Sequence, residues 1–393
     1  MRSSQRNRSC VLFCMTQVFL RASVFCHILT AVPSVCQATD WKIKSEPWPE
    51  ADQLFKRDSR WRGSDAANSI DLGNGRVLWT FGDSFVDTSS NPSKRHRKNA
   101  KFIRNSVAIQ IGYDPTSAEF HPYWQEGEEG LPSAFFRSHG EEFYWPGGGL
   151  MLDDKLLVFL MRIRNSRGRM GFVVAGWGAV LVANPEDKPT DWKIQFVDTP
   201  PNSLGVMVGS GSSLCLGDWV YSYGSDTSRC HQLFLTRLLV TDALAANFSH
   251  LQWWNSSGKT WQKQTEIDEQ PPSPIVKSGQ TEFTVHFEPK LNLYLLTQFE
   301  SFPRSPIAIR HSEALTGLWS PMRKAFIPEE AGSGKNHEML YAAKAHPEQT
   351  ANGLAVTYCT NSKKRETVVK EESLYYPRFV RFHFTVQADE VAQ

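Results

Sequence analysis

Apolar stretches of five to eight residues recur along the chain from about residue 60, and polar or glycine-rich turns separate them. This pattern is typical of β-strands, and the 3.6-residue period of amphipathic helices is nearly absent. A short helix is expected over Thr241–Asn247. The predicted strands are Val77–Phe81, Ser106–Ile111, Leu156–Arg162, Trp219–Tyr223, Leu233–Leu239, Leu293–Gln298, Ile307–His311, Leu354–Tyr358 and Arg378–Thr385. The sequence therefore predicts an all-β fold.

A longer repeat joins these strands into units. A polar or glycine-rich segment followed by a strand, a turn and another strand begins near Asp65, Pro146, Ser210, Glu282 and Glu338. Each interval is long enough for a four-stranded sheet with variable loops. We therefore expect a single five-bladed β-propeller. Two or three β-sandwiches are the alternative, because one sandwich needs only about 100 residues.

The first 38 residues differ from the rest of the chain, with three arginines ahead of an apolar run and no acidic residue. This layout is typical of a secretory signal peptide. Arg21 interrupts the apolar run, and a membrane span needs about 20 apolar residues. We assign 1–38 to a cleaved signal peptide and 39–393 to the propeller, a catalytic-type domain. A secreted or periplasmic protein without a stable membrane span is expected, and a retained anchor or a lipoprotein attached through Cys36 is the alternative.

The basic charge of the chain belongs to this leader. It carries four arginines, so the formal net charge of +2 becomes −2 once the leader is removed. Phosphate binding depends on clustered Lys and Arg, so no nucleic-acid partner is expected. The segment Lys94–Lys98 is the exception. We interpret it as a solvated loop, and a polyanion site is the alternative.

The cysteines indicate no disulfide framework. Four of the seven lie in the leader, which leaves Cys215, Cys230 and Cys359. We expect Cys215 and Cys230 on strands two positions apart, about 9.6 Å, which is too far for a bond. The chain also has no Cys-x-x-Cys or His-Glu-x-x-His pattern, so neither a metal nor a cofactor is expected.

Two aspartates flank the hairpin that residues 64–87 predict. Asn74-Gly75 lies between apolar flanks, and both positions of such a turn take positive φ. A strand rises about 3.3 Å per residue, so two strands of equal length return the chain to its starting level. Asp65 and Asp83 are therefore expected together at the open end of the hairpin.

These acids suit the hydrolysis of a glycosidic bond, in which one carboxylic acid protonates the leaving oxygen and a carboxylate acts as base or nucleophile. We expect Asp65 and Glu282 in these roles, because both begin units of the repeat and would face each other across a central funnel. Asp83 would raise the pKa of a neighbour or bind sugar hydroxyls. The alternative is that Asp83 only caps a turn.

Five further residues are candidates for binding substrate. Trp145 precedes Pro146 and three glycines, and an indole stacks on the apolar face of a sugar. The other four offer hydrogen-bonding side chains and are Arg104, Asn105, His337 and Arg378. Each has a structural alternative: a tight strand entry for the tryptophan segment, a buried core group for the histidine, and ion pairs at strand edges for the others.

Several motifs resemble the domain-of-unknown-function family 4185. They are Trp61-Arg62-Gly63-Ser64-Asp65-Ala66-Ala67-Asn68-Ser69-Ile70-Asp71-Leu72, Leu78-Trp79-Thr80-Phe81-Gly82-Asp83-Ser84-Phe85, Arg104-Asn105-Ser106, Trp145-Pro146-Gly147-Gly148-Gly149 and Tyr375-Tyr376-Pro377-Arg378-Phe379-Val380-Arg381. The resemblance implies a five-bladed propeller related to furanosidases, some of them endo-acting D-arabinofuranosidases that cut arabinan. It also implies that Asp65 and Asp83 match the acids of that family.

Two hypotheses follow for function. The first is a secreted glycoside hydrolase that cleaves a furanose-containing, arabinan-like polysaccharide or oligosaccharide through Asp65, Asp83 and Glu282. The second is a non-catalytic propeller that binds glycans or a protein, since propellers have many functions. Convergence of the three acids in one funnel would favour hydrolysis. An outward Asp83 together with an ion-paired Glu282 would favour binding.

Overall fold

Each of the nine stretches predicted as strands forms a strand, with ends that differ from the prediction by up to four residues. The computed structural model describes residues 41–89, 97–168, 170–332, 338–349 and 353–386, all within the unit Thr39–Gln393. The predicted leader, His337 and residues 94–96 of the basic segment lie outside the described residues. The predicted short helix is also confirmed, as α2 (Val240–Leu244). The all-β expectation is therefore confirmed.

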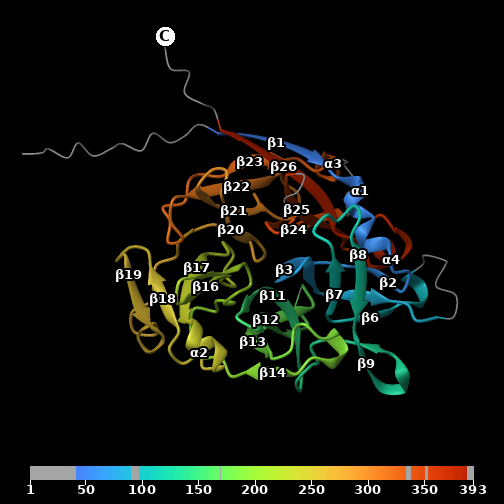
Figure 1. Ribbon diagram of the computed structural model, residues 1–393, viewed down its shortest axis with the longest axis horizontal. Helices are drawn as coiled ribbons and strands as arrows, with labels where there is room; N and C mark the ends of the chain where they lie inside the picture. The colour runs from blue at the N-terminus through green and yellow to red at the C-terminus, as the bar shows by residue number, and fades with distance from the viewer. Residues whose placement is uncertain (1–40, 90–96, 169, 333–337, 350–352, 387–393) are drawn as a thin grey trace, which may run out of the picture. The chain divides into compact units, whose positions relative to one another are not determined.

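Five larger antiparallel sheets account for most strands of the described residues (Figure 1). The first contains β3 (Asn68–Gly73), β4 (Arg76–Phe81), β7 (Ser106–Ile111) and β8 (Glu119–Tyr123). The second contains β11 (Glu142–Leu152), β12 (Lys155–Asn165), β13 (Phe172–Val182) and β14 (Ile194–Val197). The third contains β15 (Ser213–Leu216), β16 (Trp219–Ser225), β17 (Leu233–Leu239), β18 (Gln252–Asn255) and β19 (Thr260–Lys263).

In the fourth large sheet, neighbouring strands again follow one another in the sequence, and in the fifth only the outer-edge strand departs from this order. The fourth contains β20 (Thr284–Glu288), β21 (Leu293–Phe299), β22 (Ile307–Ser312) and β23 (Arg323–Phe326). The fifth contains β24 (Glu338–His346), β25 (Leu354–Ser362), β26 (Arg378–Val386) and, at its outer edge, β1 (Trp41–Pro47). Trp41 pairs with Val386 and Pro47 with Val380, so the fifth sheet joins the two ends of the described chain. The sequence analysis did not predict β1.

The described elements also include two small sheets, three more short α-helices and five 3-10 helices. The small sheets are β2 (Trp61–Ser64), β5 (Ser84–Val86) and β6 (Lys101–Ile103), and β9 (Gln125–Glu126) with β10 (Pro132–Ser133). The α-helices are α1 (Pro49–Asp52), α3 (Glu329–Gly332) and α4 (Arg365–Lys370). The sheet β2-β5-β6 continues from the two ends of the β3–β4 hairpin.

Hydrophobic clusters pack each large sheet against the next. Ile70 of the first sheet packs with Val158 of the second, and Phe159 of the second packs with Phe234 of the third. The third and fourth sheets share a cluster, as do the fourth and fifth. A further cluster joins Trp79 of the first sheet to Phe379 of the fifth. The last sheet therefore packs on the first.

The first strand of every large sheet faces one shared cavity of about 410 Å³. Its lining includes residues of β3, β11, β15, β20 and β24. These strands begin at or within four residues of the five segment starts predicted from the repeat. Such an arrangement, with successive antiparallel sheets around a central channel, is typical of β-propellers.

The cysteines agree with the sequence-based expectations in part. Cys215, Cys230 and Cys359 are free thiols, so Cys215 and Cys230 are unbonded as predicted. Cys230 lies in the loop before β17, however, and not on that strand. In the described part of the chain, no helix has the length and apolar character needed to cross a membrane.

Candidate active site

The β3–β4 hairpin brings Asp65 and Asp83 to the same end, as its sequence predicts. Asn74 and Gly75 in the turn have φ of 54° and 76°, and Asn68 pairs with Thr80 at the open end. The backbone N–H of Gly82 donates to the carbonyl of Asp65 over 3.1 Å. The two aspartates thus leave the first sheet side by side and continue into β2 and β5.

Two tyrosines hold the carboxyl group of Asp65, one on β24 of the fifth sheet and one in the loop before β26. The hydroxyl of Tyr341 donates to Oδ2 over 2.7 Å and that of Tyr375 donates over 3.3 Å. Burial and the charges of Asp83 and Glu282 raise the pKa of Asp65 well above its usual value, and the two hydrogen bonds oppose this rise. Asp65 therefore holds a proton more firmly than an ordinary aspartate.

Both carboxylate oxygens of Asp83 are occupied. The indole Nε1 of Trp145 donates to Oδ1 over 3.0 Å, and a guanidinium nitrogen of Arg104 lies 3.6 Å from Oδ2. Burial raises the pKa of Asp83 to about 6, and the contacts with Trp145 and Arg104 act in the opposite direction. With both oxygens held, Asp83 fits an orienting and electrostatic role beside Asp65 better than attack on a substrate.

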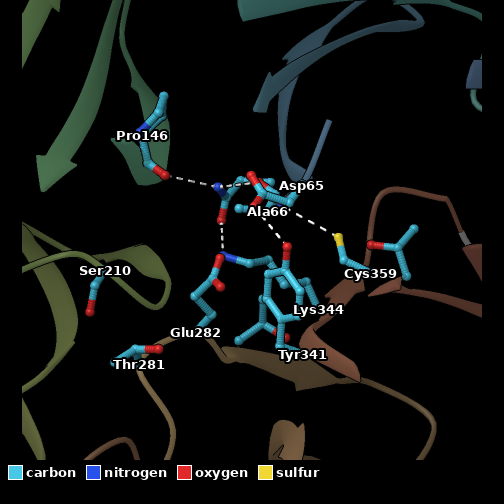
Figure 2. A network of polar contacts seen from close by, with 12 residues as sticks. Asp65, Ala66, Pro146, Ser210, Thr281, Glu282, Tyr341, Lys344 and Cys359 are labelled. Carbon is cyan, nitrogen blue, oxygen red and sulfur yellow. Dashed lines mark hydrogen bonds and ion pairs between the residues drawn. The ribbon is translucent and has the colours of Figure 1, made fainter. Parts of the chain in front are cut away.

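Glu282 enters the cluster from the segment before β20 and meets a buried lysine. Lys344 Nζ lies 3.5 Å from Glu282 Oε1 and donates to Asn68 Oδ1 over 2.6 Å. The Lys344 side chain is 0% exposed, whereas those of Glu282 and Asp83 each keep 14% of their exposed surface. Figure 2 shows Glu282 pointing toward the lysine, with Asp65 and Tyr341 on the far side of it. The side chains of Glu282 and Asp83 are thus partly accessible to solvent.

Three residues with left-handed backbone conformation surround this cluster. Ala66, directly after Asp65, has a φ of 54°, Ala342 directly after Tyr341 has 56°, and Tyr375 itself has 62°. Residues other than glycine rarely adopt this region, which costs about 1 to 3 kcal/mol and persists where surrounding contacts enforce it. The N–H of Ala66 is held by the buried thiol of Cys359 over 3.3 Å. The strain lies where the acids and their partners are positioned.

The other predicted site residues divide into two groups. Arg104 and Trp145 join the acids through Asp83, as described. Asn105 does not: it is 0% exposed, and its amide bonds to Phe136 and Tyr144 backbone atoms. Arg378 does not either, because it lies on β26, pairs with Glu330 and donates to the carbonyl of Ser373 over 3.0 Å. In this structure neither side chain contacts the three acids: Asn105 is held by backbone groups, and Arg378 forms an ion pair.

Three residues that the sequence analysis did not single out complete the cluster. Tyr375 begins one of the quoted motifs, and Tyr341 lies three residues after the unit start at Glu338, so both are close to features that the sequence analysis named. Lys344 gave no signal. A register shift between Tyr341 and Lys344 turns both toward the acids, although their spacing of three would place them on opposite faces of a regular strand.

The described part of the basic segment contradicts the solvated-loop interpretation at one residue. Arg97 is 3% exposed and donates to four backbone carbonyls. One acceptor is Leu374, next to Tyr375, and the distance is 2.6 Å. Arg97 thereby supports the loop that carries Tyr375.

Among the described side chains, no group of three or more His, Cys, Asp or Glu residues is arranged to hold a metal ion. The arrangement that remains is a cluster of carboxyls with hydrogen-bond donors, which can exchange protons with a bound molecule.

Solved structures with a similar fold come from several organisms. A candidate hydrolase from Bacteroides ovatus matches with a TM-score of 0.65 and 17% identity, over 89% of this chain and 92% of that one. A GH43_1 enzyme from Xanthomonas citri, solved with xylose, has a TM-score of 0.45 and 11% identity over 88% and 95% of the two chains. The catalytic domain of a GH62 α-L-arabinofuranosidase from Coprinopsis cinerea has 0.43 and 10% over 90% and 99%. No protein with a curated description matches.

The family assignment corrects the resemblance drawn from the motifs. Similarity to the domain-of-unknown-function family 4185 is the wrong interpretation, because the matching family model is a different one and covers residues 50–384. The motifs around Asp65 and Asp83 lie inside that range, so they belong to the matched domain. The chain is a member of the family described as domain of unknown function DUF5005.

Proposed function

We propose that this protein is a glycoside hydrolase built on a five-bladed β-propeller. The observation that carries the activity is the convergence of Asp65, Asp83 and Glu282, since the charges of the last two both act on Asp65. The propeller is supported by five sheets that pack in succession, the last on the first, around one cavity. The Bacteroides ovatus protein with this fold is itself described as a candidate hydrolase.

The chemistry of the cluster suits general acid and base catalysis. Burial raises the pKa of both Asp65 and Asp83, so these two carboxyls keep a proton at pH values where exposed aspartates have lost theirs. Asp65 and Glu282 divide the two roles of proton donor and base or nucleophile on either side of the glycosidic bond. Asp83 does not react with the substrate in this scheme, because Trp145 and Arg104 hold both of its oxygens. Its charge raises the pKa of Asp65.

The substrate is a carbohydrate whose identity the test below decides. The arabinan-like substrate followed from the resemblance to family 4185 and loses that support with the correction. A furanose polymer nevertheless belongs among the first substrates tested, next to pyranose polymers.

A second candidate function has one observation in its favour. Glu282 is ion-paired with Lys344, and this is one of the two features expected of a non-catalytic glycan-binding propeller. The other expected feature, an outward Asp83, is contradicted by the contacts of Asp83 with Trp145 and Arg104. Hydrolysis is therefore the first proposal.

The test is product release from arabinan, arabinogalactan, xylan and galactan by the chain from residue 39 onward. Asp65→Asn and Glu282→Gln keep side-chain size, and each should lower release from the cleaved polymer by at least about a hundredfold. An activated aryl glycoside then separates the roles: the variant that lacks the proton donor keeps more activity on it, because this leaving group needs little protonation.

Asp71→Asn is the matched control. Asp71 lies on β3 and is exposed. It accepts hydrogen bonds from Gly73 and Tyr113 that an asparagine oxygen can still accept. It should leave release unchanged. Binding of a polymer without release of any product would overturn hydrolysis in favour of the second function.

We also propose export, with residues 1–38 as the removed signal peptide. The supporting features are the arginines ahead of an apolar run and the lack of acidic residues. Expression in the native host followed by mass measurement of the mature chain tests this, and a mature chain that begins at Met1 would contradict it.

A further inference from the structure

A second cavity of about 660 Å³ opens beside the acid cluster. It lies between the loop at Ser138–Phe143 and the end of β12, and Arg104 forms part of its wall. Arg104 also reaches Asp83 at 3.6 Å, so a single side chain touches both the cavity and the acids. A molecule that fills the cavity would extend from the site of bond cleavage.

Aromatic and amide groups give this cavity a defined wall. The guanidinium of Arg104 lies 4.0 Å from the ring centre of Phe143 and donates to Asn165 Oδ1 over 2.9 Å. Phe143 in turn contacts Trp145, with ring centres 5.8 Å apart, and Trp145 holds the other oxygen of Asp83. Two connections therefore join the cavity wall to Asp83: Arg104 contacts it directly, and Phe143 contacts it through Trp145. The position of Asp83 thus depends on the same side chains that shape the cavity.

The charges of the wall balance. Arg104 is matched by Asp83, and Glu142 is matched by Arg162 at 2.6 Å. This leaves Arg164 and Glu141, one of each sign, with no hydrogen-bond partner for either side chain among the described residues. The cavity wall therefore has no excess charge that would select a cation or an anion, whereas a neutral polyhydroxylated ligand would find both a donor group and an acceptor group.

We propose that this cavity is a subsite for a neutral sugar residue of the substrate, adjacent to the residue whose bond is broken. Arg164 and Glu141 bind its hydroxyls, and Asn165 fixes the position of Arg104 between the two sites. The inference builds on the proposed hydrolysis and extends it, because it identifies which side chains give the enzyme its preference for a chain over a single sugar.

The test measures binding in a Glu282→Gln background, so that no probe is consumed. The probes are arabino-, xylo- and galacto-oligosaccharides of two to five residues, titrated by calorimetry. For the series that binds, Arg164→Ala should weaken affinity roughly tenfold, as expected for loss of a charge-assisted hydrogen bond. Ser138→Trp, which fills the cavity from an exposed loop position, should weaken it as well.

Arg167→Ala is the matched control, because Arg167 is an exposed arginine three positions further on that does not line the cavity. Its affinity should equal that of the parent. A neutral ligand also predicts no change in affinity between about 50 mM and about 500 mM NaCl, a span over which added salt screens surface charges. Tighter, salt-sensitive binding of uronic-acid oligosaccharides would overturn the neutral assignment.

The outcomes separate this subsite from the proposed function. Cleavage of an oligosaccharide by the parent chain, together with equal affinity of the Arg164→Ala and Ser138→Trp variants, overturns the subsite alone. Binding that depends on both positions but never leads to cleavage overturns hydrolysis and supports the subsite. Absence of binding by every probe overturns the subsite.

Discussion

The hydroxyl of Tyr341 donates a hydrogen bond of 2.7 Å to Oδ2 of Asp65, across 276 positions of sequence. The bond joins the first strand of the fifth sheet to the start of the first sheet. Tyr341 also accepts a hydrogen bond of 3.0 Å from Asn361 on the neighbouring strand, which fixes the direction of its hydroxyl. The charge state of Asp65 is therefore set from the opposite end of the chain.

Tyr341→Phe should move the titration of Asp65 to higher pH. The hydroxyl favours the ionised carboxylate, so its loss raises the pKa of Asp65 further. The measurement is the pH dependence of kcat/KM. Tyr113→Phe removes a comparable 2.9 Å bond to the exposed Asp71 and should leave the profile unchanged. If the Tyr341→Phe and Tyr113→Phe variants had the same pH dependence of kcat/KM, this would contradict the role of Tyr341.

Gly82→Ala should disable the site at little cost in stability. A Cβ at Gly82 would lie 2.5 Å from Asp65 Oδ1, so the carboxyl must move. A displacement of about 1 Å costs on the order of a hundredfold in rate. Gly178→Ala is the control, because its Cβ would meet nothing closer than 3.8 Å. Steady-state kinetics and thermal unfolding of both variants decide, and full activity of Gly82→Ala would contradict the placement of Asp65.

Asp83 should make the folded state less stable as pH rises. Burial raises its pKa from 3.8 to about 6, so the folded protein holds a proton that the unfolded chain has released between these values. The stability that this proton gives is present below about pH 4 and lost as pH rises through about pH 6. Relative to Asp83→Asn, the parent should lose about 2 to 3 kcal/mol between pH 4 and pH 7, at about 1.36 kcal/mol per unit.

Urea unfolding at a series of pH values measures this difference. Glu142→Gln gives the opposite sign, because the hydrogen bond from Arg162 lowers the pKa of Glu142 and its stabilisation is lost as pH falls. A parent chain and an Asp83→Asn variant with parallel pH curves would show that Asp83 is not buried as described.

Lys344→Met should destabilise the protein, because Glu282 and Asn68 then lose a fully buried cation. Breaking a buried pair costs about 3 to 5 kcal/mol, and the double variant with Glu282→Gln should recover part of it. The exposed pair of Arg60 and Asp58 is the comparison, and Arg60→Met should cost less than about 1 kcal/mol. A double-mutant cycle with no coupling between positions 344 and 282 would contradict the ion pair.

The sequence by itself determined nine of the strands and the hairpin that carries two of the acids. These features depend on local rules: alternation of apolar side chains, and positive φ at Asn74 and Gly75. The convergence of Glu282 on Asp65 was predicted only through the inference that inner strands of separate sheets face one another.

Only the tertiary structure decided which side chains surround the acids. Tyr341 and Lys344 face the site together because the register shifts between them, and Tyr375 does so in a left-handed conformation supported by Arg97. Asn105 and Arg378 have side chains suited to bind substrate, but both contact other groups of the protein. Asn105 donates to two backbone carbonyls, and Arg378 contacts a backbone carbonyl and Glu330. The physical reason is that a bulge, a strained residue or a competing partner depends on contacts between distant segments, and no local pattern of residues encodes it.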